Sequence, residues 1–141
     1  MNSNQITKIL RKLPVPGAVY PSDQLPAHIH FPSALICNTD PQDEPGEHWI
    51  AICFDKQGQG EYFDPYGLQP FPPFIPFMNS CSSWKYNDVC LQSPLSQTCG
   101  QHCLTYLIHR CQGIDMNTYV QRFSNDLMQN DVLVSKFIQS L

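Results

Sequence analysis

A cysteine followed by glycine marks the part of the chain best suited to chemistry. Cys99-Gly100 opens an apolar helical pattern, and Gln92 lies seven residues upstream of the cysteine. At a helix N-terminus the backbone N–H groups are unpaired and the helix dipole is positive, which favours a thiolate. A glutamine just before it can donate a hydrogen bond to an oxyanion. These residues predict a nucleophilic thiol with a donor for the charge that its attack creates.

Two residues earlier in the chain supply the base and the carboxylate that thiol catalysis needs. His48 begins the strongest strand pattern, residues 48–55, and Asp64 ends the returning pattern, residues 61–64. An antiparallel hairpin brings the start of its first strand near the end of its second, so these side chains are expected close together. An imidazole can take the thiol proton and later protonate a leaving amine, while a carboxylate orients it. The predicted set is that of a thiol hydrolase.

Structural interpretations compete with this one. A cysteine is more often a core residue than a nucleophile, and an aspartate before proline commonly starts a turn. Cys99 and Cys103, with His102 and Cys111 nearby, also invite a zinc interpretation. The two cysteines lie one turn apart on a single helix, however, and no second Cys/His pair follows at a suitable spacing. We therefore predict no metal.

Length and composition limit the number of domains and the classes of protein to which this chain can belong. The 141 residues predict one domain, spanning 1–141. A net charge of −4 with scattered basic residues gives no electrostatic footprint for nucleic acid. The polar N-terminus and the lack of a long apolar run predict neither a signal peptide nor membrane insertion. Seven cysteines, an odd number, then suggest free thiols in an intracellular, reducing compartment.

Hydrophobic periodicity predicts the elements that must position these residues. The expected helices and strands are a helix at 4–13, strands at 33–38, 48–55, 61–64 and 85–91, a helix at 99–111, a helix containing Tyr119, Val120, Phe123 and Leu127, and a last helix capped near Asn130. Residues 14–32 and 39–47 are expected to be irregular. Four prolines in 68–78 argue against a regular helix there.

The motifs resemble those of the adenovirus endopeptidase (adenain) family and its relatives in viruses and large DNA transposons. That family has His-Trp, then Glu/Asp-Pro-aromatic-Gly, then Gln with Cys-Gly seven residues on. The matching residues here are His48-Trp49, Asp64-Pro65-Tyr66-Gly67, and Gln92 with Cys99-Gly100. The resemblance covers residues 4–111. It implies a triad of Cys99, His48 and Asp64, with Gln92 and the Cys99 amide as the oxyanion hole.

The resemblance also implies a fold and a substrate. The fold is α+β and is shared with the SUMO-specific proteases: a small mixed β-sheet flanked by helices, with the nucleophile at the N-terminus of a central helix. The activity is that of a cysteine endopeptidase cutting next to small, glycine-type residues, in the maturation of viral or transposon capsid or precursor proteins. A viral chain would then act in the host nucleus or cytoplasm, or in the virion. Trp49 and Gly100 are the expected substrate-binding residues, although a core tryptophan is an equal alternative.

An activating partner is a further implication of the resemblance. Adenain forms a disulfide with a short viral peptide, and Cys81 falls at the corresponding place when counted back from Gln92. The chemistry itself requires no cofactor. Adenain is also basic and stimulated by DNA, whereas a net charge of −4 argues against DNA binding here. Two alternatives stay open: a protease that releases ubiquitin-like modifiers, and a non-catalytic binding module with the same fold.

Overall fold

A mixed β-sheet forms the centre of the molecule. The computed structural model describes residues 1–43 and 48–141. Five strands lie in the order β1-β2-β3-β4-β5, with the bounds β1 Gly17–Tyr20, β2 Ser33–Asn38, β3 Trp49–Phe54, β4 Gln59–Phe63 and β5 Ser83–Tyr86. The central pairs, β2–β3 and β3–β4, are antiparallel, and each outer strand pairs in parallel with its neighbour.

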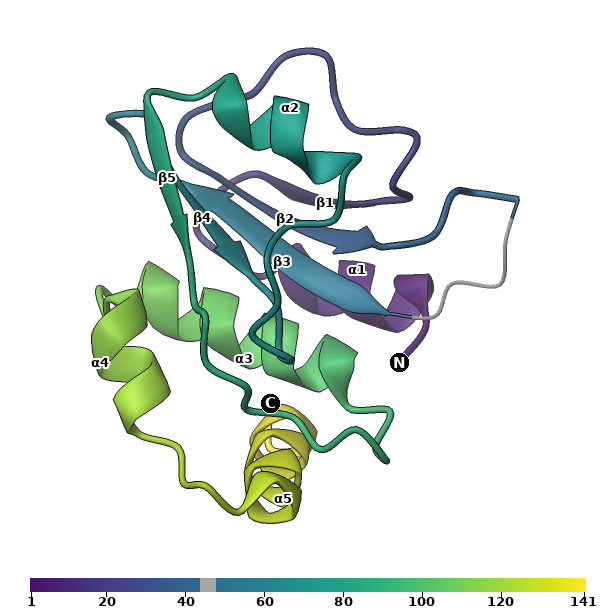
Figure 1. Ribbon diagram of the computed structural model, residues 1–141, viewed down its shortest axis with the longest axis vertical. Coiled ribbons are helices and arrows are strands. Elements are labelled where there is room, and N and C mark those ends of the chain that lie inside the picture. Colours follow the sequence, from purple (N-terminus) through teal and green to yellow (C-terminus); the bar gives the residue numbers. More distant parts are fainter. Residues whose placement is uncertain (44–47) are drawn as a thin grey trace.

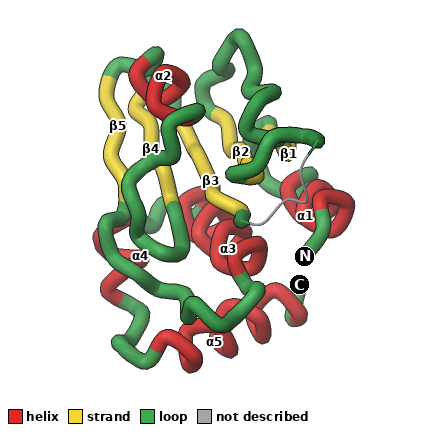
Figure 2. The backbone as a smooth tube through the Cα atoms, turned by 45° about the vertical axis from the view of Figure 1, so that its right-hand side comes forward, coloured by secondary structure: helices red, strands yellow, loops and turns green. Residues whose placement is uncertain are grey.

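Helices cover both faces of this sheet. Their bounds are α1 Ser3–Leu10, α2 Phe74–Asn79, α3 Cys99–Cys111, α4 Met116–Gln121 and α5 Leu127–Gln139. Helix α3 runs under the strands beside α1, and α5 packs on α3 away from the sheet, while α2 lies on the opposite face (Figures 1 and 2). Within the described ranges, no helix combines the length and apolarity that crossing a membrane requires.

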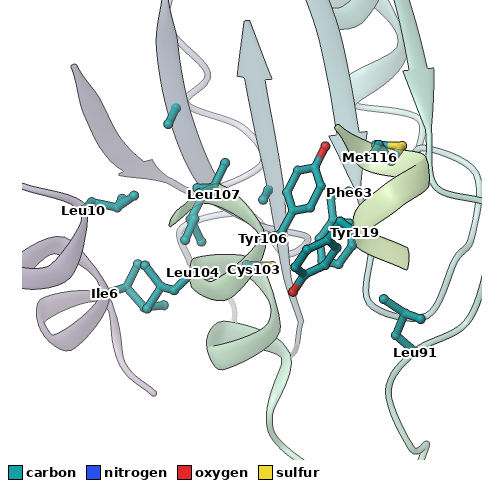
Figure 3. Close-up of a cluster of buried hydrophobic side chains, with 13 residues drawn as sticks. Ile6, Leu10, Phe63, Leu91, Cys103, Leu104, Tyr106, Leu107, Met116 and Tyr119 are labelled. Carbon is teal, nitrogen blue, oxygen red and sulfur yellow. The ribbon is translucent and has the colours of Figure 1, made fainter. Parts of the chain in front are cut away.

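Alternation along the central strands creates two hydrophobic cores. Ile36 and Ala51 point toward α3 and belong to the larger core, in which the rings of Phe63 and Tyr106 stack with centroids 4.3 Å apart (Figure 3). Ile50 and Ile52 point the other way, against α2. Both faces of β3 are therefore buried, which explains its uninterrupted apolar run. The sheet and α3 form a rigid base whose element ends carry the candidate site.

Most of the predicted elements are present with shifted ends. The first helix is shorter than predicted and begins after Asn2, which forms a capping box with Gln5. The hairpin and the helix at 99–111 match the prediction closely. The predicted strand at 85–91 lies earlier, at 83–86. Residues 44–47, the end of the loop predicted at 39–47, lie outside the described residues.

Four predictions about elements were wrong for physical reasons. Strand β1 lies in the supposedly irregular segment 14–32, because a short, half-exposed edge strand lacks an alternating pattern. Helix α2 occupies the end of the segment 68–78 and continues to Asn79, because Pro76 lies in its first turn, where no N–H is needed. Helix α4 ends at Gln121 and does not reach Leu127. Asp126, rather than Asn130, caps α5.

Two loops press together where β4 ends. The Pro65 carbonyl accepts hydrogen bonds from the N–H groups of Leu91 at 2.8 Å and Gln92 at 3.1 Å. Gly67 adopts a φ of +72°, and a Cβ there would lie 2.5 Å from the carbonyl carbon of Val89. Only glycine fits this conformation in this space. The contact fixes the segment that follows β4 against the segment that leads to α3.

We predict that Gly67→Ala destabilises the protein more than Gly113→Ala does. Both glycines have positive φ, but a Cβ on Gly113 would meet nothing within 4 Å. Gly113→Ala should therefore cost only the left-handed backbone conformation, about 1–2 kcal/mol. Gly67→Ala should cost about 1–3 kcal/mol more, through overpacking against backbone. Chemical denaturation measures both values, and equal losses would contradict the loop contact.

Candidate active site

Three of the predicted site residues come into contact at one end of the sheet. His48 immediately precedes β3, Asp64 immediately follows β4, and Cys99 is the first residue of α3. The His48 Nε2 atom lies 2.8 Å from Asp64 Oδ1. The other ring nitrogen is left to receive the thiol proton of Cys99, whose pKa His48 lowers. All three side chains are buried, and Asp64 is fully so.

The pKa values of His48 and Cys99 move in opposite directions. Burial by itself lowers the pKa of His48, but hydrogen bonds and charge from Asp64 and Cys99 raise it to about 9. Burial raises the pKa of Cys99, yet His48 and the backbone N–H groups of Trp49 and Gly100 bring it below its ordinary value. Both shifts favour a thiolate beside an imidazolium, which is the reactive state of a cysteine nucleophile.

Two residues that the sequence analysis did not single out hold this pair in place. The Tyr66 ring stacks on the His48 ring with centroids 4.6 Å apart, and the Tyr66 N–H donates to Asp64 Oδ1 at 2.8 Å. Asn87 accepts from the Asp64 N–H at 2.9 Å and donates to the Asp64 carbonyl at 2.7 Å. Tyr66 is the aromatic residue of the Asp-Pro-aromatic-Gly motif, and that motif is the sequence feature that could have pointed to it. Asn87 follows β5 and has no local signal at all.

Gln92 is fully buried at the start of the loop that leads to α3. Its Nε2 donates to the Ser96 carbonyl at 3.3 Å and to Ser96 Oγ at 3.2 Å. Both distances are long for N–H···O bonds, whose usual separation is about 2.9–3.0 Å. Its Oε1 has no partner among the described residues. The amide is thus held by its own loop through two long hydrogen bonds, and its role as an oxyanion donor stays a prediction.

The environment of Trp49 and Gly100 is packed. Trp49 is half-buried, and its indole N–H donates to the Met1 carbonyl at 3.1 Å. A Cβ on Gly100 would lie 3.3 Å from Met1, 3.4 Å from Ile6 and 3.5 Å from Trp49. Gly100 therefore allows the N-terminal residues to approach α3 closely, rather than leaving open space beside its Cα. The substrate-binding roles of both residues stay predictions.

Cys81 lies far from this constellation, just before the edge strand β5. The parallel register places Ser83 beside Gln59, at the end of β4 opposite to Asp64. The Cys81 thiol donates to the carbonyls of Met78 at 2.9 Å and Ser83 at 3.2 Å. A disulfide between this thiol and an activating peptide stays a prediction.

The other cysteines and the polar groups around the best-defined cavity lie outside this constellation. All seven cysteines are free thiols. Within the described ranges, no three His, Cys, Asp or Glu side chains gather in a way that would hold a metal ion. A cavity of about 580 Å³ lies at the opposite end of the sheet, near Phe54 and Trp84, and its lining includes the ion pair of Glu61 with Arg110. It contains none of the predicted site residues.

Comparisons with known proteins place this geometry in a known fold. No family model matches the chain, and neither does any curated protein. The solved structure of ASFV pS273R protease matches with a TM-score of 0.57 and 23% identity over 72% of this chain. The chain spans only 42% of the length of that protease.

Two further solved structures match almost the whole chain. The central domain of Lpg1148 from Legionella pneumophila matches with a TM-score of 0.57 and 14% identity, over 99% of this chain and 96% of that domain. The SUMO protease Ulp1 matches with a TM-score of 0.54 and 10% identity, over 99% of this chain and 78% of Ulp1. The expected fold class is confirmed: the chain has the α+β fold of adenain/SUMO-protease-like cysteine proteases.

Proposed function

We propose that this chain is a cysteine endopeptidase with Cys99 as its nucleophile. One observation carries the proposal: a buried histidine bonds a carboxylate at 2.8 Å, and this histidine and a cysteine at a helix N-terminus shift each other's pKa values toward the ion pair. An isolated structural cysteine would have no reason to be paired in this way. The fold, which is that of cysteine proteases, supports the same conclusion.

The reaction follows from these positions. The Cys99 thiolate attacks the carbonyl carbon of a peptide bond, and the resulting oxyanion accepts hydrogen bonds from the Gln92 amide and the Cys99 backbone N–H. The His48 imidazolium then donates its proton to the leaving amine, and a thioester remains on Cys99. His48 next takes a proton from water, whose hydroxide attacks the thioester. Collapse expels the Cys99 thiolate and gives a carboxylic acid, which loses its proton to solvent, and the thiolate–imidazolium pair is restored.

Asp64 and Tyr66 do not touch the substrate in this scheme. Asp64 holds His48 through Nε2, so the opposite nitrogen faces the sulfur, and its charge stabilises the imidazolium. The Tyr66 ring covers one face of the imidazole and limits its rotation. This preorganisation matters because a proton donor must keep its alignment through both halves of the reaction.

The proposed substrates are proteins cut next to small, glycine-type residues, such as precursors of viral or transposon capsids. The support is the match of His48-Trp49 and Gln92 with Cys99-Gly100 to the adenain motifs. Trp49 is also suitably placed, since its backbone N–H helps to lower the pKa of Cys99 and its ring lies 3.5 Å from the position of a Cβ on Gly100. A bulky indole beside the nucleophile would restrict the substrate backbone there.

A modifier-releasing protease is the second candidate. The match to the SUMO protease Ulp1 over 99% of this chain favours it. Both activities would use the same thiolate, so substrates must separate them. Cleavage of short Gly-Gly peptides indicates the endopeptidase. Cleavage confined to folded ubiquitin-like proteins indicates the modifier-releasing activity.

Cys99→Ala should abolish turnover while leaving the fold intact. Loss of a triad nucleophile lowers kcat by about 10⁶-fold. Peptide hydrolysis followed by mass spectrometry measures the effect, and circular dichroism checks the fold. The matched control is Cys111→Ala, which removes a half-buried thiol from the other end of the same helix and should keep full activity. Turnover by Cys99→Ala at the rate of the unmodified chain would exclude Cys99 as nucleophile.

The pH dependence should reflect the thiolate–imidazolium pair. We expect kcat/KM to fall as pH rises through about 9, where His48 loses the proton that the leaving amine needs. At acidic pH, kcat/KM should fall as the thiolate is protonated.

The pH dependence of the rate at which iodoacetamide alkylates Cys99 reports the fraction of thiolate directly. In His48→Ala its midpoint should move upward, because burial then acts on the thiol without a compensating cation. An unmoved midpoint would show that His48 does not activate Cys99.

A further inference from the structure

The loop between Gln92 and Cys99 rests on one carboxylate of the C-terminal helix. Asp131 of α5 accepts from the Ser93 N–H at 3.3 and 3.4 Å, at the beginning of the loop. It also accepts from Thr98 Oγ1 at 3.0 Å, at the end of the loop. Asp131 is only 7% exposed. A single buried group thus fixes both ends of the segment, residues 93–98, that separates the proposed oxyanion donor from the nucleophile.

The same carboxylate attaches α5 to the nucleophile helix. His102 of α3 is fully buried, and its Nε2 lies 2.9 Å from Asp131 Oδ1. Burial lowers the pKa of His102, and the bond to Asp131 opposes that shift. Ser93, Thr98 and His102 therefore share one acceptor. A buried carboxylate with this many donors has little freedom to move, because each lost contact would leave a charge without compensation.

A chain of hydrogen bonds continues from Asp131 to the Gln92 amide. Thr98 Oγ1 lies 2.9 Å from Ser96 Oγ, and Ser96 in turn accepts from Gln92 Nε2 through its hydroxyl and its carbonyl. Deleting the carboxylate would release Thr98 and Ser93 together. Ser96 would then lose the support of Thr98, and with it the position from which it accepts from the Gln92 amide.

The bond to Thr98 also engages the residue at the start of α3. Thr98 is the N-cap residue of α3, yet its side chain makes no capping hydrogen bond. An N-cap hydroxyl usually accepts from the N–H of the second or third helical residue. Here the hydroxyl donates to Asp131 instead. The Thr98 side chain therefore ties the start of α3 to α5 rather than capping its own helix.

We propose that Asp131 is a positioning residue for the oxyanion site, acting through loop 93–98 on Gln92 and on the start of α3. This inference rests on the proposed function and extends it to the C-terminal helix, which contributes no group to the chemistry. Donors to an oxyanion must be preorganised, and small displacements of them are costly. The role of α5 is to supply the fixed acceptor that keeps Gln92 and Cys99 at one separation.

The test compares Asp131→Asn with Asp126→Asn in the full chain. Asp126 lies at the start of the same helix and caps it by accepting from the Gln129 N–H, without a bond to the loop. Asp131→Asn should lower kcat by up to about 10²-fold with little change in KM. Alkylation of Cys99 by iodoacetamide should keep its rate, because that displacement forms no oxyanion. Asp126→Asn should leave both rates unchanged. Of the bonds that Asp131 makes, Thr98→Val removes only the one to Thr98, so it should lower kcat less than Asp131→Asn does.

A double-mutant cycle shows whether Asp131 acts through Gln92. Gln92→Ala alone should lower kcat by about 10²–10³-fold. If Asp131 acts through the hydrogen bonds that lead to Gln92, adding Asp131→Asn to Gln92→Ala should lower kcat little further. Additive losses, or equal losses in Asp131→Asn and Asp126→Asn, would overturn the positioning role.

Hydrogen exchange of the loop amides separates this inference from the function on which it rests. Asp131→Asn should accelerate exchange across residues 93–98, and Asp126→Asn should not. Turnover in the unmodified chain with unchanged loop exchange in Asp131→Asn would overturn the role of Asp131 alone. Faster loop exchange in a chain that cleaves no peptide or modifier would overturn the proposed function, and with it any catalytic role for Asp131.

Discussion

The contact between His48 and Asp64 is the constraint on which the rest of the site depends. A fully buried carboxylate is costly unless a cation and hydrogen bonds compensate it, and Asp64 receives both. The antiparallel pairing of β3 with β4 brings the two residues to one sheet end, so the compensation is built into the hairpin. The imidazolium that stabilises Asp64 is also the group that lowers the pKa of Cys99. Fold stability and thiol activation therefore use one interaction.

The oxyanion side of the site is positioned by different contacts. Pro65, which follows Asp64, accepts from the Gln92 N–H, so the loop after β4 locates the glutamine relative to the histidine. Asp131 then fixes the other end of the segment against α3. Gly67 allows the two loops to meet without a Cβ between them. Strand ends position the proposed base and its carboxylate, while loops attached to helices position the proposed oxyanion donors.

Local sequence pattern is enough to predict part of the site. The apolar run of β3, the turn residues after it and the helix that begins at Cys99 together place three site residues at the ends of regular elements. Asn87 and Asp131 could not be predicted in this way, because each acts on residues 23 or more positions away. Edge strand β1 was not predicted because its residues lack an alternating pattern of apolar and polar side chains. Helix α2 was not predicted because its proline argued against a helix, although Pro76 lies in the first turn, where proline is tolerated. The packing of Gly100 against Met1 could not be predicted from local sequence either, since it depends on how α1 packs against α3.

The central proposal is that His48 selectively activates Cys99 among the cysteines of the chain. Labelling with a glycine-glycine peptide that carries a thiol-reactive group, followed by mass spectrometry of the modified residue, tests this claim most directly. The six other cysteines serve as internal controls. The account predicts rapid, selective modification of Cys99 that is lost in His48→Ala. Equal labelling of several cysteines, or selective labelling that persists in His48→Ala, would contradict it.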